Sequence, residues 1–112
     1  MTELIRRVTQ DDMTRYSREG NIHSDLEVAR SVGLDRTIAQ GMMTLAYASE
    51  LMTSVCGAEW LERGRISVKF TVPVYAGDVV RLTAEPGPDG SYGISATNQD
   101  DVVVMAGEAS LG

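Results

Sequence analysis

The only histidine of the chain, His23, is the side chain best suited to transfer protons near neutral pH, because the unperturbed pKa of imidazole lies in that range. It stands in the string GNIHSD at residues 20–25. The string IAQGM at residues 38–42 precedes an apolar segment, which places Gly41 at the expected start of a helix. An imidazole facing the backbone N–H of Gly41 would combine an acid/base group with a donor that stabilises negative charge on a carbonyl oxygen.

The candidate residues also have purely structural interpretations. His23 can order its own loop through hydrogen bonds, and Gly41 can allow a helix to pack closely on a sheet. Glu19, the nearest carboxylate upstream of His23, can be a solvated loop residue. Ser49 can be a small residue on a packed helix, and Met42 can be a core side chain, although methionine also adapts to the wall of an apolar tunnel.

Length and charge restrict the class of protein. A chain of 112 residues with 43% apolar residues predicts one folded domain over residues 1–112. A net charge of −6 disfavours binding to nucleic acid or to an anionic membrane. The sequence has no charged leader followed by an apolar stretch and no apolar run of membrane-spanning length, so we expect a cytoplasmic protein.

The sequence predicts neither a metal nor a cofactor. A single histidine without clustered cysteines or carboxylates is a poor set of metal ligands. No nucleotide-binding fingerprint is present. Cys56, the only cysteine, falls in an apolar helical pattern, which favours a packed residue over a nucleophile.

Hydrophobic periodicity predicts an α+β fold. A capping sequence at Thr9 opens a helix that runs to about residue 16, and Ser24 or Asp25 caps a second helix over residues 26–32. Residues 41–55 are apolar on nearly all sides, which is typical of a buried helix. Alternating patterns predict strands at residues 4–8, 66–74, 79–85, 92–97 and 102–111, and the last four form an antiparallel meander.

Three strings in this order resemble the MaoC-like hotdog dehydratases and the (R)-specific enoyl-thioester hydratases. They are NIHSD at residues 21–25 after Tyr16, IAQGM at residues 38–42, and FTVPVYAGD at residues 70–78. The resemblance covers roughly residues 8–82. It implies a single hotdog domain, in which an antiparallel sheet wraps around one long central helix.

The resemblance also assigns roles to residues. In the family motif Ser-Gly-Asp-x-Asn-Pro-x-His, the Asp and His hold the water that adds to, or leaves from, the β-carbon of an acyl thioester. By this resemblance His23 is the acid/base residue and Asn21 occupies the Asn position. The Gly41 N–H would bind the thioester carbonyl, Ser49 would support the site, and Met42 would border the acyl group.

The chain departs from the family pattern before His23. The segment from Tyr16 to His23 is about four residues shorter than the pattern, and both the Asp and the Pro of the motif are missing. Glu19 is the nearest carboxylate upstream that can fill the vacant position. We therefore predict a catalytic set of His23, Glu19 and Gly41, with Asn21 and the α-helical Ser49 and Met42 as substrate-binding residues.

The predicted function is dehydration of a 3-hydroxyacyl thioester, or the reverse hydration of an enoyl thioester, in fatty-acid, polyketide or related acyl-thioester metabolism. The substrate would be an acyl-CoA or an acyl-carrier-protein thioester. Two alternatives remain open: a non-catalytic hotdog subunit that supports a complete partner, and a hotdog enzyme with altered chemistry, such as a thioesterase, isomerase or cyclase. Because a small sheet leaves an edge open, we expect a homodimer, with a hotdog heterodimer as the alternative.

Overall fold

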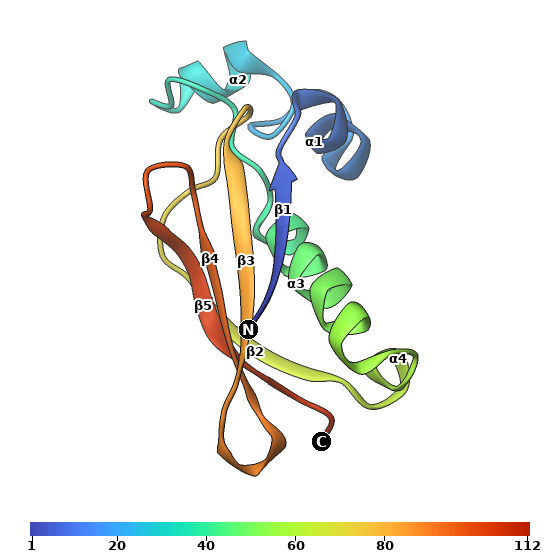
Figure 1. Cartoon of the computed structure of the whole chain (residues 1–112). Coiled ribbons are helices and arrows are strands. Elements are labelled where there is room, and N and C mark those ends of the chain that lie inside the picture. Colours follow the sequence, from blue (N-terminus) through green and yellow to red (C-terminus); the bar gives the residue numbers. More distant parts are fainter.

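The computed structural model describes residues 1–112 and contains one five-stranded sheet. The strand order is β1-β3-β4-β5-β2, and every neighbouring pair is antiparallel (Figure 1). The outer strands are therefore β1 and β2. The expected four-strand meander is wrong for β2, which pairs with β5 and not with β3, so the meander is limited to β3, β4 and β5. The strands are β1 (Thr2–Arg7), β2 (Arg65–Phe70), β3 (Val79–Pro86), β4 (Tyr92–Thr97) and β5 (Val103–Ser110).

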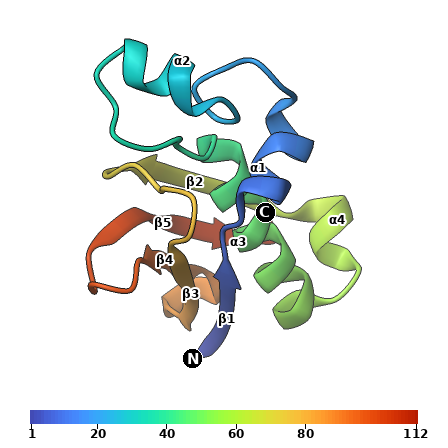
Figure 2. The same ribbon diagram turned by 90° about the horizontal axis from the view of Figure 1, so that it is seen from above.

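The sheet curves around the long helix α3 (Gly41–Cys56), as the view from above shows (Figure 2). The predicted α+β hotdog arrangement is thus confirmed. The core lies between the concave face of the sheet and α3, where apolar side chains exclude water from both layers. Its most completely buried large side chains are Met13, Leu51, Met52, Leu82 and Met105.

The helix α3 is buried on one side only. Its buried residues are Met43, Thr44, Ala48, Leu51 and Met52. The expectation of a helix buried nearly all round is wrong, because the outward positions on the same helix, such as the 53%-exposed Met42, face away from the single sheet. No helix of the chain, α3 included, has the length and apolar character needed to cross a membrane.

Two short helices, α1 (Gln10–Ser17) and α2 (Leu26–Ser31), lie together at one end of the sheet (Figure 1). Their start signals work as predicted. The Thr9 hydroxyl accepts a hydrogen bond from the Asp12 N–H at 3.1 Å, and the Asp25 carboxylate accepts from the first turn of α2. The loop that carries His23 joins these two helices.

The chain between α3 and β3 differs from the sequence-based expectation. A short helix, α4 (Glu59–Arg63), follows α3 and was not predicted, and it buries Trp60 against the core. The strand expected over residues 66–74 ends at Phe70, and the chain leaves the sheet after Thr71, whose N–H still donates to the Val104 carbonyl at 3.0 Å. Pro73 follows and has no N–H with which to continue a ladder.

A turn before β3 is held by the carboxylate of Asp78, which is only 3% exposed. Its two oxygens accept hydrogen bonds from the Tyr75 N–H at 2.9 Å and from Gln99 Nε2 at 3.0 Å. Gly77 occupies the turn with a φ of +92°, which glycine adopts without steric cost. The predicted turn is confirmed, and its carboxylate acts as a structural acceptor.

Gly107 in β5 allows β2 to approach closely. A Cβ atom at this position would overlap the carbonyl oxygen of Ser67 and lie 2.7 Å from the Cα of Val68. Backbone atoms cannot swing aside as a side chain can, so we expect Gly107→Ala to lower the free energy of unfolding by about 2 kcal/mol or more. Urea denaturation measures this loss.

Gly93→Ala in β4 is the matched control, because the nearest atom to its Cβ would be the Glu85 carbonyl oxygen at 3.9 Å, an ordinary contact. The control should shift the free energy of unfolding by less than about 1 kcal/mol. Equal losses in the two variants would contradict the close approach of β2 and β5.

Candidate functional site

The connector that leads into α3 is fixed by main-chain hydrogen bonds on two sides. On one side, the Ala39 N–H donates to the Val74 carbonyl at 2.7 Å, and Ile38 forms a single antiparallel bridge with Tyr75. On the other side, the Ile38 N–H donates to the Ile22 carbonyl at 3.2 Å. The connector therefore joins the His23 loop to the segment between β2 and β3.

The imidazole of His23 is oriented by the same connector. Its Nδ1 lies 2.7 Å from the carbonyl oxygen of Ile38. A carbonyl oxygen can only accept, so Nδ1 must carry the hydrogen of the neutral ring. The lone pair is then on Nε2, which makes no hydrogen bond to the protein. His23 thus presents one free basic nitrogen in a defined tautomer.

Asn21 fixes the loop from which His23 projects. Its Oδ1 accepts from the His23 N–H at 2.9 Å, and its Nδ2 donates to the Ser17 carbonyl at 2.8 Å. The preceding Gly20 has a φ of +83°, which allows the tight turn out of α1. Asn21 thus contacts the backbone of His23, and its substrate-binding assignment stays a prediction.

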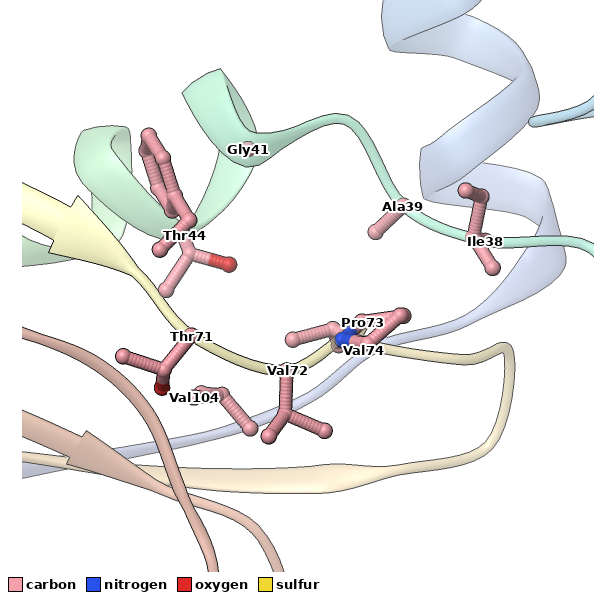
Figure 3. A pocket seen from close by; sticks show the side chains of 10 residues that line it. Ile38, Ala39, Gly41, Thr44, Thr71, Val72, Pro73, Val74 and Val104 are labelled. Atoms are coloured by element: carbon pink, nitrogen blue, oxygen red, sulfur yellow. The ribbon is translucent and has the colours of Figure 1, made fainter.

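A pocket of ≈ 280 Å³ opens where the connector meets the start of α3. Figure 3 shows Gly41 and Thr44 on the helix side and the segment after β2 opposite them. The lining is mostly apolar, which is typical of a small-ligand site. Its residues are Ile38, Ala39, Gly41, Thr44, Phe70, Thr71, Val72, Pro73, Val74 and Val104.

Gly41 is the first residue of α3, and its N–H takes part in no hydrogen bond of the structure. A free N–H at a helix N-terminus carries partial positive charge and is a ready donor to an anionic oxygen. The absence of a Cβ also matters here, because one would lie 3.0 Å from the tip of the Phe70 ring. Gly41 therefore keeps both the donor and the space in front of it accessible.

Thr44 is a pocket residue that the sequence analysis did not single out. It lies one turn after Gly41, and its hydroxyl points into the pocket (Figure 3). No protein group forms a hydrogen bond with this hydroxyl. The only available signal was the spacing of three residues from Gly41, which places both residues on one helix face.

The structure connects His23 to the pocket indirectly. His23 does not itself line the pocket, but its Nδ1 partner, Ile38, does. Glu19 is exposed and forms no hydrogen bond or ion pair, so no contact links it to His23. The catalytic assignment of Glu19 therefore stays a prediction.

Ser49 and Met42 line a different hollow, on the outward side of α3, together with Tyr16. The Ser49 hydroxyl accepts a hydrogen bond from the indole N–H of the buried Trp60 at 2.7 Å. The structure thus gives Ser49 a structural partner that sequence spacing could not reveal. The substrate-binding assignment of Ser49 and Met42 stays a prediction.

The two groups with a perturbed pKa lie away from the pocket. Burial raises the pKa of the Tyr47 phenol, and the hydrogen bond to Glu50 raises the pKa of Arg6. Both face a hollow between β1, α1 and α3 that does not include Gly41. No group of three or more His, Cys, Asp and Glu side chains is arranged to hold a metal ion. His23 is consequently the one acid/base candidate that contacts the pocket wall.

The fold is similar to that of several solved structures. No curated protein matches the chain. Among solved structures, the unliganded R-hydratase PhaJ1 from Pseudomonas aeruginosa has a TM-score of 0.76 at 22% identity, over 96% of this chain and 75% of that one. The (R)-hydratase from A. caviae involved in PHA biosynthesis has a TM-score of 0.74 at 21% identity, over 98% and 92%. The ChsH1-ChsH2 complex from Mycobacterium tuberculosis has a TM-score of 0.73 at 19% identity, over 98% and 93%.

The family comparison covers most of the chain. The family described as "MaoC like domain" matches residues 2–102, a range that includes the His23 loop, the connector and the start of α3. The match confirms the resemblance seen in the three sequence strings. The structural neighbours, all below 25% identity, agree in fold. The chain belongs to the MaoC-like domain family.

Proposed function

We propose that the protein is a hydratase or dehydratase that adds water to an enoyl thioester, or removes it from a 3-hydroxyacyl thioester. The observation that carries this proposal is the hydrogen bond from His23 Nδ1 to the carbonyl of Ile38, because Ile38 lines the same pocket as Gly41, whose N–H is free. Membership of the MaoC-like family and the fold of the two R-hydratases support the same reaction class.

In the hydration direction, the two groups divide the work. His23 Nε2 takes a proton from water while the water oxygen bonds to the β-carbon of the enoyl group. The electrons of the double bond move to the α-carbon and the thioester oxygen, where the Gly41 N–H stabilises the enolate. The imidazolium then returns its proton to the α-carbon. Dehydration is the same sequence in reverse, and neither direction consumes another reactant.

The pocket at the start of α3 has the size for a small apolar substituent. Its ≈ 280 Å³ and mostly apolar lining suit a short acyl chain on a CoA or carrier-protein thioester. The acyl chain that the pocket accepts would decide whether the protein acts in fatty-acid, polyketide or related acyl-thioester metabolism.

A second candidate is a non-catalytic subunit that completes a heteromeric enzyme. The favouring observation is that the motif Asp is missing and that no carboxylate contacts the His23 ring. One structural neighbour is itself a complex of two different chains, ChsH1 and ChsH2. In this alternative, a partner subunit supplies the carboxylate, and the isolated chain binds thioesters without converting them.

We expect His23→Ala to lower kcat for hydration of a short enoyl-CoA by about 10²- to 10⁴-fold, because the acid/base group is lost. Loss of the conjugated-thioester absorbance measures the rate. Glu19→Gln tests the second predicted catalytic residue, with Glu27→Gln as its control, since Glu27 is an exposed carboxylate on α2. An unchanged rate in His23→Ala would refute the proposed mechanism, and no activity in the wild-type chain would favour the heteromeric alternative.

The Gly41 donor can be tested with a pair of substitutions that add the same Cβ. Gly41→Ala keeps the N–H, whereas Gly41→Pro removes it, and proline suits both the first helical position and the extended backbone of Gln40. We expect kcat of the proline variant to lie about 10²- to 10³-fold below that of the alanine variant. Equal kcat values in two folded variants would show that this N–H does not stabilise the enolate.

We propose that the protein is active as a homodimer that covers the mouth of the pocket. Two large apolar side chains of its lining are exposed: Phe70 at 51% and Val72 at 37%. Phe70 also ends the outer strand β2, whose free edge offers unpaired main-chain groups to a second sheet. Burial of these side chains against a second copy would enclose the substrate as well as the edge.

Two matched substitutions test this interface. Phe70→Glu places a charge at the β2 edge, and Ile5→Glu places one on the opposite outer strand at nearly the same exposure, 51% against 55%. Sedimentation at micromolar concentration should give a dimer for the wild type and for Ile5→Glu, and a monomer for Phe70→Glu. A monomeric wild-type protein would contradict the proposed homodimer. It would also contradict the proposal that a second copy of the chain covers the mouth of the pocket.

A further inference from the structure

The side chain of Gln10, at the start of α1, contacts both segments that hold the His23 ring. Its Nε2 donates to the backbone carbonyl of His23 at 3.0 Å. Its Oε1 accepts from the hydroxyl of Thr37, the residue before Ile38. One amide therefore bridges the loop that carries the imidazole and the connector whose carbonyl orients it.

The chemistry of the partners fixes the orientation of this amide. The His23 carbonyl can only accept, so the NH₂ group of Gln10 must face it. The oxygen then faces Thr37, whose hydroxyl must donate. A remaining hydrogen of Nε2 reaches the Thr14 hydroxyl at 3.3 Å, within the same helix. Glutamine is the one common side chain of this length that supplies both a donor and an acceptor here.

At one end of the bridge, the partner of Gln10 is the buried side chain of Thr37. Thr37 is 3% exposed, and Gln10 is the only hydrogen-bond partner of its hydroxyl. An unpaired buried hydroxyl is costly, which favours keeping the contact. Although Gln10 itself is exposed, three hydrogen bonds restrain its amide at once.

We infer that Gln10 is a positioning residue, because it holds the loop and the connector at a fixed separation. It thereby maintains the tautomer and the orientation of the His23 ring. The inference rests on the proposed hydratase function for its effect on rate. Gln10 does not line the pocket and forms no hydrogen bond with the ring, so we infer that it acts through the hydrogen bond from His23 Nδ1 to Ile38. Loss of the bridge should loosen that bond and let the hydrogen exchange between the two ring nitrogens.

The test uses the fact that His23 is the only histidine. Nitrogen-15 NMR of histidine-labelled protein, at a pH where the ring is neutral, reports each ring nitrogen without overlap. The variant is Gln10→Met, which keeps the length and removes all three hydrogen bonds of the amide. The matched control is Thr9→Ala, which removes the cap of α1 but leaves the Gln10 amide in place. Thr37→Val removes the hydrogen bond between Thr37 and Gln10 at nearly constant side-chain volume, and it replaces Gln10→Met in the test if that variant does not fold.

In the wild type we expect Nδ1 protonated and Nε2 unprotonated. In Gln10→Met the two signals should move toward a mixture of tautomers, and kcat should fall about tenfold or more with little change in KM. In Thr9→Ala the melting temperature should fall while the ring signals stay as in the wild type.

Unchanged ring signals in folded Gln10→Met would overturn the inference, and so would the same shift in Thr9→Ala. If the wild type does not hydrate enoyl thioesters, the proposed function fails, and the ring signals alone then decide whether Gln10 positions His23.

Discussion

The pinning of residues 37–39 between the His23 loop and the segment before β3 is the constraint on which the site depends. The connector donates a main-chain hydrogen bond to the His23 loop, and it both donates to and accepts from the segment before β3, so it is held on both sides. It carries the Ile38 carbonyl that orients the imidazole and ends at the Gly41 N–H. The base and the donor are therefore placed relative to each other by main-chain hydrogen bonds, to which the Gln10 amide adds a side-chain bridge.

Much of the fold follows from the sequence pattern, because helix and strand periods differ clearly in this chain. The helix starts at Thr9 and Asp25 and the long helix from Gly41 all form where their capping and apolar signals predict. The pattern fails where it is ambiguous. Met42 and Met43 are equally apolar, so periodicity could not tell which side of α3 meets the sheet. The alternation beyond Phe70 continues through residues that Pro73 keeps out of the ladder.

The candidate site was predictable only as far as its motif residues. His23, Asn21 and Gly41 were identified from sequence strings, and the structure joins the first two directly and the third through the connector. Contacts made by main-chain atoms, such as the Ile38 carbonyl, depend on no side-chain identity and leave no mark in a single sequence. Gln10 is missed for a related reason, since its helix-start position already explains a polar residue.

The hydrogen bond from Trp60 to Ser49 has a consequence for observation of the molecule. Trp60 is the only tryptophan, so it dominates the intrinsic fluorescence of the chain. Its buried indole is anchored to Ser49 of α3, and Ser49 in turn lines the hollow that also contains Met42 and Tyr16. Indole emission depends on the polarity around the ring. The fold has thus placed a native optical reporter in the core between α3 and α4, where entry of water around the indole shifts the emission to longer wavelength.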